Sequence, residues 1–235
     1  MTASIAEVCV VACAQAWRGD GAILASPMGL IPSLGARLAR LTFSPELLVT
    51  DGEAMLLDAD QAVEGWMPYR DVLRLVATGR RHMMMGAAQL DRYGNQNISA
   101  IGDWAKPKAQ LLGVRGAPGN TINHPVSYWV PRHSPRVFTA QVDMVSGIGY
   151  DRSPRCHELR IVVTDKAVLD FGTPDHSMRL RSVHPGVTVG QVRDLTGFEL
   201  VIGDNVVTTP MPTDTELTLI RDRLDPAGLR DGEVR

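Results

Sequence analysis

Hydrophobic residues near the start of the chain alternate between helical and strand-like spacing. Apolar positions recur at helical spacing from residue 4 to residue 17, and Ser4 and Glu7 have the spacing of a capping box. The pattern then predicts a short strand, a second helix and a second strand, at residues 22–25, 34–41 and 47–49. This order favours a sheet of parallel strands flanked by helices.

The rest of the chain continues the mixed pattern. A helix, three strands and a last helix are predicted at residues 71–78, 83–85, 137–142, 161–164 and 214–224. A further strand at 168–171 is expected to pair with 161–164 across a turn. The charged tail after Pro226 is expected to be mobile. Residues 86–136 are rich in Gly, Asn and Pro, which indicates long loops, and such loops in a compact domain usually carry function.

Composition describes an ordinary globular protein. With 235 residues, 44% hydrophobic and 21% charged, the chain fits a single α/β domain over residues 1–235 with a mostly parallel sheet. A net charge of −2 gives no overall attraction for nucleic acid or membrane lipid. The sequence has neither a signal-peptide pattern nor a run of about 18 apolar residues, so we expect a cytoplasmic protein.

Three cysteines are too few for a disulfide framework and suit a reducing compartment. Cys9 and Cys13 are four residues apart on the first predicted helix, where a metal or redox pair is one interpretation and burial as small hydrophobic residues is the favoured one. Cys156 stands alone. Since no cysteine or histidine–carboxylate spacing of metal-site type occurs, we expect no metal.

Two segments combine turn residues with polar groups. In the first, Gln89, Asn95 and Asn97 supply amides that could grip a polar ligand or fix neighbouring loops. The second, residues 114–120, is rich in glycine, which permits close approach of a ligand to the backbone. His124 lies four residues beyond Asn120 and could reach a substrate bound there.

Two carboxylates follow the predicted strand at 47–49. Both carboxylates, Asp51 and Glu53, could cap a structural turn there. His184 precedes Pro185, a setting in which a structural histidine is more common than a catalytic base. Adjacent Asp, His and Ser at 175–177 do not by themselves indicate a triad, because a triad requires spatial proximity.

Several motifs together resemble the beta-subunit half of a family I coenzyme A transferase. They are residues 86–97, 183–188 and 196–198. The resemblance implies a NagB/RpiA/CoA transferase-like fold, acyl-CoA substrates, and a cleft lined by the segment from Gln89 to Asn97. It also implies that Gly116, Gly119 and Asn120 belong to a loop whose amides approach the thioester and stabilise an oxyanion.

The same resemblance exposes a departure at the nucleophile. The family places a glutamate after the second strand, where it attacks the thioester. Here Thr50 or Asp51 occupies that position, and Glu53 is displaced by two or three residues, so the resemblance makes Asp51 and Glu53 the candidate catalytic residues. Because small displacements of a reacting atom slow a reaction strongly, transfer through an enzyme-bound thioester is disfavoured.

One branch of the family, the hydrolases that cleave steroid rings, matches further motifs. These are residues 50–54, 65–68, 93–100, 146–151 and 171–179. The branch implies an alpha-subunit partner in a heterodimer or α2β2 heterotetramer, a cyclic keto-acyl-CoA substrate, and no cofactor apart from the coenzyme A of the substrate. A glutamyl-thioester CoA transferase and a noncatalytic subunit that completes its partner's site are the alternatives.

A subunit that holds half a site should be unstable or inactive alone. Apolar segments 28–32 and 128–130 are candidates for the interface, although both could equally belong to the core.

Overall fold

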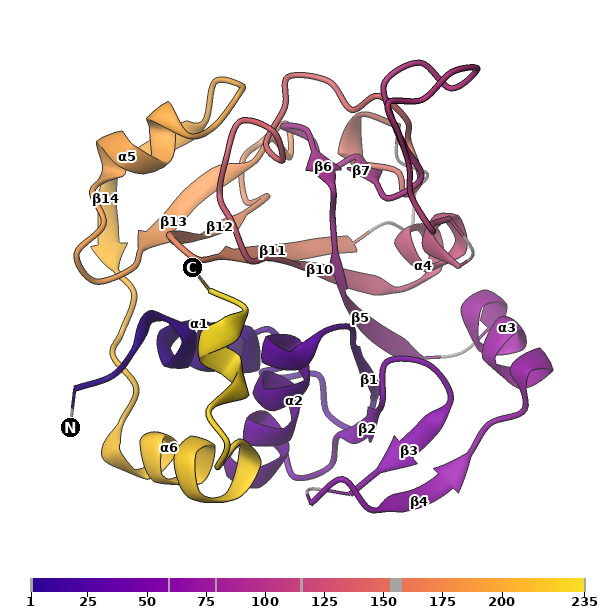
Figure 1. Cartoon of the computed structure of the whole chain (residues 1–235), viewed down its shortest axis with the longest axis vertical. Coiled ribbons are helices and arrows are strands. Elements are labelled where there is room, and N and C mark those ends of the chain that lie inside the picture. Colours follow the sequence, from indigo (N-terminus) through magenta and orange to yellow (C-terminus); the bar gives the residue numbers. More distant parts are fainter. Residues whose placement is uncertain (1, 59, 79, 115, 153–157, 235) are drawn as a thin grey trace.

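The computed structural model describes residues 2–58, 60–78, 80–114, 116–152 and 158–234 (Figure 1). Strands of the main sheet are β1 (Leu24–Pro27), β2 (Leu48–Thr50), β3 (Met55–Leu57), β4 (Val63–Trp66), β5 (Arg81–Gly86), β10 (Pro125–Val130), β11 (Glu158–Thr164), β12 (Ala167–Asp170), β13 (Arg179–Val183) and β14 (Val201–Thr208). Two small hairpins pair β6 (Gln89–Leu90) with β7 (Gln96–Asn97) and β8 (Ala100–Ile101) with β9 (Ala109–Gln110).

The helices surround this sheet. They are α1 (Ile5–Gln15), α2 (Leu30–Thr42), α3 (Tyr69–Thr78), α4 (Ala117–Asn123), α5 (Val189–Asp194) and α6 (Asp214–Thr218). A π-helical turn, η2 (Leu219–Leu224), continues α6, and the short 3₁₀ turns are η1 (Tyr150–Arg152) and η3 (Leu229–Gly232).

Strand order in the main sheet is β14-β13-β12-β11-β10-β5-β1-β2-β3-β4. The five central strands, β11 to β2, run parallel, as the sequence predicts. Both flanks contain antiparallel pairs, which join β11, β12 and β13 on one side and β2, β3 and β4 on the other. The predicted hairpin is confirmed, because Val163 pairs with Val168. The architecture is therefore a mixed, helix-flanked α/β sheet with a parallel centre.

Alternation along β5 supplies both hydrophobic cores. Met84 points into the core beneath α1 and α2, whereas Met83 and Met85 point into the core on the opposite face. Trp129 of β10 joins the first core and Tyr128 the second. Each face of the sheet is thus covered, and β5 and β10 are central buried strands.

The first helix forms as the sequence predicts. The side chain of Ser4 accepts a hydrogen bond from the backbone amide of Glu7. The side chain of Glu7 in turn accepts one from the backbone amide of Ser4, so the capping box is complete. Cys9 and Cys13 are free and fully buried, which confirms the interpretation as small hydrophobic residues. Cys156 lies outside the described residues.

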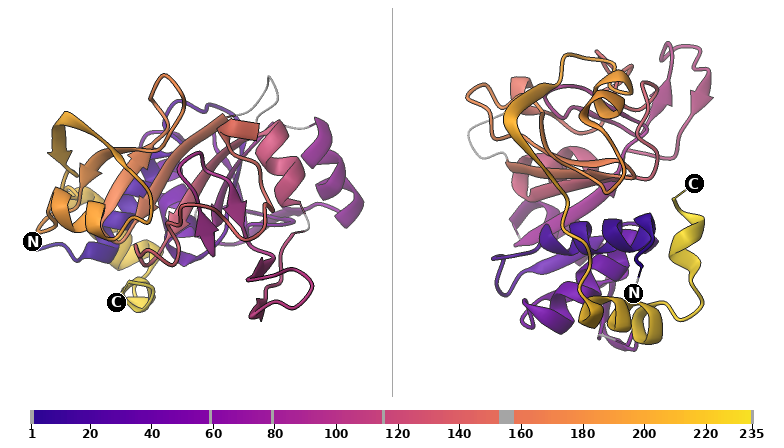
Figure 2. Two further views of the ribbon diagram at one scale, coloured as in Figure 1. Left: turned by 90° about the horizontal axis from the view of Figure 1, so that it is seen from above. Right: turned by 90° about the vertical axis from the view of Figure 1, so that its left-hand side faces the viewer.

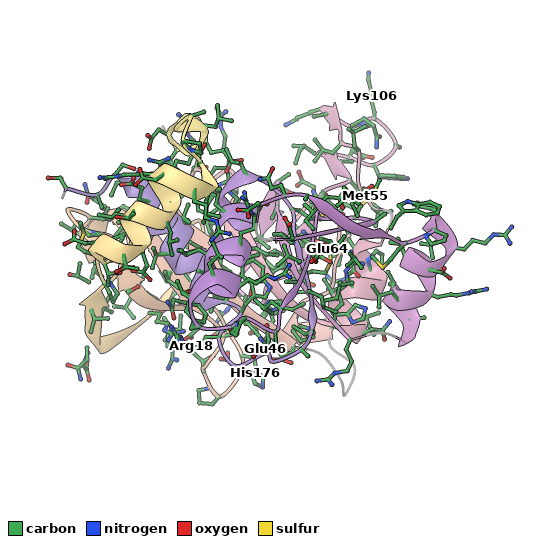
Figure 3. All side chains as sticks on the ribbon, turned by 90° about the horizontal axis from the view of Figure 1, so that it is seen from below. Arg18, Glu46, Met55, Glu64, Lys106 and His176 are labelled. Atoms are coloured by element: carbon green, nitrogen blue, oxygen red, sulfur yellow. The ribbon has the colours of Figure 1, made fainter. Side chains whose placement is uncertain are left out.

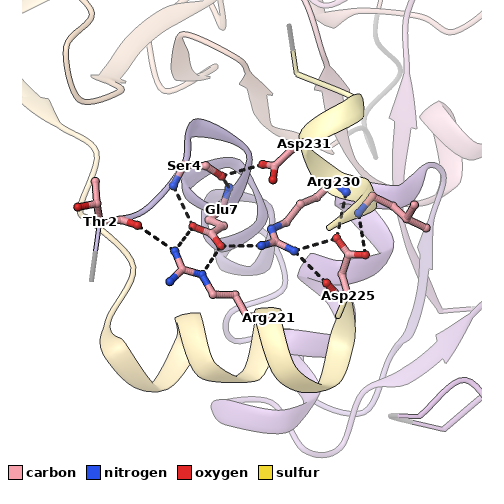
Figure 4. Close-up of polar contacts among 8 residues, drawn as sticks. Thr2, Ser4, Glu7, Arg221, Asp225, Arg230 and Asp231 are labelled. Carbon is pink, nitrogen blue, oxygen red and sulfur yellow. Dashed lines mark hydrogen bonds and ion pairs between the residues drawn. The ribbon is translucent and has the colours of Figure 1, made fainter. Parts of the chain in front are cut away.

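The tail beyond Pro226 is anchored, and the expectation of mobility is wrong. Arg230 is buried and donates to Glu7 of α1 and to Asp225 (Figure 4). Glu233 accepts from the amides of Leu30 and Ile31 at the start of α2. The C-terminal segments consequently lie beside α1 and α2 (Figure 2).

Two further expectations are corrected. Residues 137–142 form no regular strand, since only Phe138 makes an isolated bridge, to Leu90. The middle of the chain is not loop throughout, because it contains α4 and the central strand β10. Residues 128–130 are therefore core within this chain rather than an exposed interface. None of the helices in the described part of the chain is long and apolar enough to cross a membrane.

Candidate functional site

A cavity of about 350 Å³ lies between β5, the turn after β2, and the helices α3 and α4. Glu53, Gly116 and Asn120, three of the residues singled out from the sequence, line it together. Most of the remaining wall is apolar: Met28, Val72, Leu73, Val76, Met83, Met85, Ile98 and Leu112. Its volume and lining are typical of a pocket for a small organic ligand.

The mouth of the cavity is unusually apolar for a surface. Four of its lining residues have strongly exposed side chains: Met28, Tyr69, Leu73 and Leu112. The β8–β9 arm stands beside it and projects outward, with Lys106 at its tip (Figure 3). An exposed apolar rim of this kind marks a binding surface.

The turn after β2 presents Glu53 to the cavity. Asp51 Oδ1 accepts from the amides of Glu53, Ala54 and Met55 at 2.9, 2.9 and 3.2 Å, so this carboxylate organises the turn. Gly52 has φ of 100°, and a Cβ there would lie 2.8 Å from the carbonyl oxygen of Pro27. Glycine at this position therefore lets the turn fold tightly and places Glu53 on the wall, whereas Asp51 is not part of the lining.

Thr50, which with Asp51 is one of the two residues expected at the nucleophile position, is buried at the end of β2. Its Oγ1 donates toward the carbonyl of Ala25 at 3.4 Å and lies 3.2 Å from Ser26 Oγ.

The segment expected to form a glycine-rich loop is instead the start of α4. Gly116 is the N-cap residue, and Pro118 lies in the first turn. A Cβ on Gly119 would lie 2.5 Å from Val76 Cγ1, so this glycine allows α4 to pack closely on α3. Asn120 is buried, and its Oδ1 has no hydrogen-bond partner among the described residues. Arg115, within the same segment, lies outside the described residues.

His124 follows α4 and is buried next to the site rather than on the cavity wall. Burial lowers its pKa, and the positive charge of Arg81 lowers it further, while the backbone at Leu75 and Val76 opposes the shift. Its Nε2 has no partner among the residues that the structure describes. The ring is therefore neutral at neutral pH and retains hydrogen-bonding capacity.

The amides of Gln89, Asn95 and Asn97 are buried and engaged within the chain. Asn97 Nδ2 donates to Gln89 Oε1 at 2.7 Å, and Gln89 Nε2 donates to Asp143. Asn95 donates to Asp91 and Asp151. None of the three lines the cavity. They hold the 86–151 loops together, and direct substrate contact by them stays a prediction.

Two other sequence motifs are structural. His184 is fully buried, with Nδ1 3.0 Å from Thr209 Oγ1 and Nε2 2.8 Å from the carbonyl of Thr164. Ser177 Oγ donates to Asp175 at 2.7 Å, while the ring of His176 stacks on Tyr150. Ser177 is therefore not paired with His176 as a triad would require.

Sequence reasoning missed Arg81, the first residue of β5. Its side chain lines the cavity and is 3% exposed. Its Nε donates to Ser26 Oγ at 2.8 Å, and its Nη2 lies 3.5 Å from the carbonyl of Gly52. Burial lowers its pKa to about 10, and the carboxylate of Glu53 opposes that shift. An arginine at the head of a buried methionine strand was the signal available in the sequence.

A second, larger depression of about 960 Å³ lies between α1 and the strands β11 to β13. Its lining includes Arg18, Arg160 and His176 and contains none of the site residues predicted from the sequence. The smaller cavity is thus the better candidate, because three predicted residues, Glu53, Gly116 and Asn120, converge there.

A model of the family described as coenzyme A transferase matches residues 73–195. The chain belongs to the coenzyme A transferase family. It is 54% identical over 97% of its length to the cholesterol ring-cleaving hydrolase IpdB subunit of Rhodococcus jostii, of which 95% is covered. It is 30% identical over 92% of its length to a 3-oxoadipate CoA-transferase subunit of Pseudomonas knackmussii, with 91% of that protein covered.

The fold of the family is matched closely. The crystal structure of Rhodococcus jostii RHA1 IpdAB superimposes with a TM-score of 0.95 at 53% identity and covers 100% of both chains. The expectation of a CoA transferase-like fold is therefore confirmed.

Proposed function

We propose that this chain is the beta-type subunit of a heteromeric acyl-CoA hydrolase that cleaves a carbon–carbon bond in a ring of a cyclic keto-acyl-CoA derived from a steroid. The observation that carries the proposal is the 54% identity to the ring-cleaving hydrolase subunit over 97% of the chain. Identity to the transferase subunit, at 30%, is far lower over a similar span.

The geometry at the end of β2 supports hydrolysis over transfer. Thr50 is a buried hydroxyl, and Asp51 is occupied by three backbone amides. Glu53 is the carboxylate on the cavity wall, three residues beyond Thr50. A carboxylate on a mostly apolar wall is suited to general-base catalysis.

In the proposed reaction, a carboxylate removes a proton from a water molecule while the oxygen of that water adds to the carbonyl carbon of the ring ketone. The ring carbon–carbon bond then breaks, and its electron pair passes to the carbon next to the thioester. The resulting enolate takes up a proton, so the products are a new carboxylate and an intact thioester. Glu53 and a carboxylate of the partner subunit are the two candidate bases.

The proposal includes an alpha-subunit partner in a heterodimer or α2β2 heterotetramer, which the exposed apolar mouth of the cavity supports. It requires no metal and no cofactor beyond the coenzyme A of the substrate. We place the protein in the cytoplasm, and the free thiols of Cys9 and Cys13 support a reducing compartment.

The test is incubation of the two-subunit complex with cyclic β-keto acyl-CoAs in oxygen-18 water. We expect ring opening, one heavy oxygen in the new carboxylate and coenzyme A still attached to the product. Release of free coenzyme A with the ring intact would instead identify a simple thioesterase and refute the proposal.

A CoA transferase is the second candidate, favoured by the near-full-length match to the transferase subunit. It would form a glutamyl-CoA thioester through Glu53. Borohydride treatment after incubation with acyl-CoA would trap that thioester on this chain. Trapping on Glu53, with coenzyme A moved to an added acid, would decide for the transferase.

A further inference from the structure

Arg81 is a buried cation that forms no ion pair with a described carboxylate, and the charge of Glu53 on the same cavity wall reaches it only from a longer distance. Arg81 as a whole residue is 3% exposed, and among the described residues no carboxylate lies within ion-pair distance of its guanidinium. Its two hydrogen-bonding partners, Ser26 Oγ and the carbonyl of Gly52, are neutral. Nη1 makes no hydrogen bond to the described part of the chain. A buried charge in this state is costly unless a ligand completes it.

Arg230 shows how the same chain treats a structural buried arginine. Its Nη1 donates to Asp225 Oδ2 at 3.0 Å and its Nη2 to Glu7 Oε1 at 2.8 Å. Two carboxylates therefore neutralise Arg230 inside the protein. Arg81 lacks this arrangement and faces the cavity instead.

Two further polar side chains, Asn120 and His124, each have a buried atom without a hydrogen-bond partner among the described residues. Asn120 lines the same cavity, and its buried Oδ1 has no partner among the described residues. Since the oxygen and nitrogen of an amide are assigned from their surroundings, Asn120 can turn its NH2 group toward a ligand oxygen. His124 is close enough to Arg81 for the guanidinium charge to lower the pKa of the ring, and its Nε2 is unpartnered in the described residues. Arg81 and Asn120 thus both offer hydrogen-bonding capacity to a cavity whose other lining is mostly apolar.

We propose that Arg81, assisted by Asn120, forms an anion subsite that binds an oxyanion of the acyl part of the substrate. The ligand is an apolar, ring-sized group that carries a negatively charged oxygen. The apolar wall of Met83, Met85 and Val76 holds the ring, and the guanidinium meets the oxygen. The assignment of the ligand as substrate rests on the proposed function, whereas the anion preference is a property of the cavity itself.

The oxyanion has two chemical sources. It is either a carboxylate that the substrate carries before reaction or the oxygen that becomes negative when water adds to the ring ketone. A standing carboxylate would contribute to binding of the ground state, whereas a developing oxyanion would contribute only in the transition state. Both kinds of oxyanion would bind the same guanidinium, and the separate effects of a variant on KM and kcat distinguish between them.

A binding experiment tests the subsite without any turnover. Cyclohexanecarboxylate and its neutral isostere, cyclohexanecarboxamide, are titrated into the full-length chain in complex with its co-expressed partner. We expect the carboxylate to bind at least tenfold more tightly than the amide. Arg81→Met should abolish this preference, Arg81→Lys should keep part of it, and the surface control Arg193→Met should leave it intact. Equal binding of the two probes, or an unchanged preference in Arg81→Met, would overturn the proposal.

Kinetics with the ring substrate then identify the source. A KM raised more than tenfold in Arg81→Met with kcat unchanged assigns the subsite to a standing carboxylate. A kcat lowered more than tenfold with KM unchanged assigns it to the reacting oxygen, and unchanged values of both reject a role in the reaction. The melting temperature of Arg81→Met controls for folding, and it should not fall, because the variant removes a buried, uncompensated charge. If the complex cleaves no ring, the proposed function fails. The anion subsite is then still tested by the preference of the chain for the carboxylate probe over the amide probe.

Discussion

Arg230 Nη2 lies 2.8 Å from Glu7 Oε1 and so joins two residues 223 positions apart in the sequence. Arg221 meets the same carboxylate from the other side, with Nε 2.7 Å from Oε1 and Nη2 2.8 Å from Oε2 (Figure 4). Ser4 completes the set through its backbone amide at 2.8 Å. One carboxylate on α1 therefore holds both C-terminal helical turns.

Glu7→Gln should destabilise the fold. The variant leaves two arginines without their shared anion, and breaking a buried pair in this way costs about 3 kcal/mol. Urea unfolding followed by circular dichroism measures the loss. The exposed Glu46→Gln is the matched control, expected within about 0.5 kcal/mol of the wild type.

The same carboxylate should give the stability a pH dependence. The hydrogen bonds from Arg221 in the first place, then those from Ser4 and Arg230, lower the pKa of Glu7 from 4.5 to about 2, against the opposing effect of burial. Because the folded-state pKa is the lower one, this stabilisation is complete above about pH 4.5 and is lost as the pH falls toward 2. Unfolding of Glu7→Gln should show a shallower pH slope across that window. An identical slope in both proteins would contradict the assignment.

Glu233 should act as a distant cap for α2. The N-cap residue Gly29 offers no side chain, and Glu233 instead accepts from Leu30 N at 3.0 Å and Ile31 N at 3.2 Å. It also accepts from Trp129 Nε1 at 3.2 Å. Glu233→Ala should lower the free energy of unfolding by about 1–2 kcal/mol. Glu233→Gln keeps one acceptor oxygen, so its free energy of unfolding should lie between those of the wild type and Glu233→Ala. An alanine variant as stable as the wild type would show that the contact is dispensable.

Gly52→Ala should impair both folding and turnover. Alanine at φ of 100° is strained, and its Cβ would press on the carbonyl oxygen of Pro27, so we expect a loss of about 2 kcal/mol. Turnover should fall more than tenfold, because the turn that carries Glu53 must move. Gly203→Ala in β14, where a Cβ meets nothing within 4 Å, is the control and should leave both quantities unchanged.

Glu53→Gln should lower kcat for ring opening at least about 100-fold if this carboxylate is the base. The control Glu64→Gln changes a carboxylate on β4 that does not line the cavity (Figure 3). Activity close to the wild type in Glu53→Gln would place the base on the partner subunit. Unchanged turnover in Glu53→Gln, Asn120→Ala and Gln89→Ala alike would favour a noncatalytic subunit.

Local signals in the sequence predicted what depends on neighbours along the chain. Ser4 and Glu7 interact across three residues, and their capping box is confirmed. The predicted hairpin at Val163 and Val168 is equally local. Residues 137–142 have strand-like composition, but their partner β6 contains only two residues, so a single bridge at Phe138 forms. Strand propensity without a partner of matching length does not produce a strand.

Long-range contacts explain what the sequence did not reveal. Arg81 meets Ser26 and Gly52 only because β1, β2 and β5 lie side by side in the sheet. In the sequence alone, the charged tail has the composition of a solvated segment. Only the fold shows that Arg230 of this tail pairs with Glu7. Glu53, in contrast, was identified from the family resemblance, which implies a glutamate shortly after the second strand, and it lines the cavity.

The contact between Glu7 and Arg230 also constrains the order in which parts of the chain can pack during biosynthesis. A ribosome releases the chain from its amino end, so α1 emerges more than two hundred residues before the arginines that neutralise its carboxylate. Until then neither arginine is available to pair with Glu7. The helix α1 can therefore form early through its local capping box, whereas its packing against the C-terminal turns waits until Arg221 and Arg230 have been synthesised.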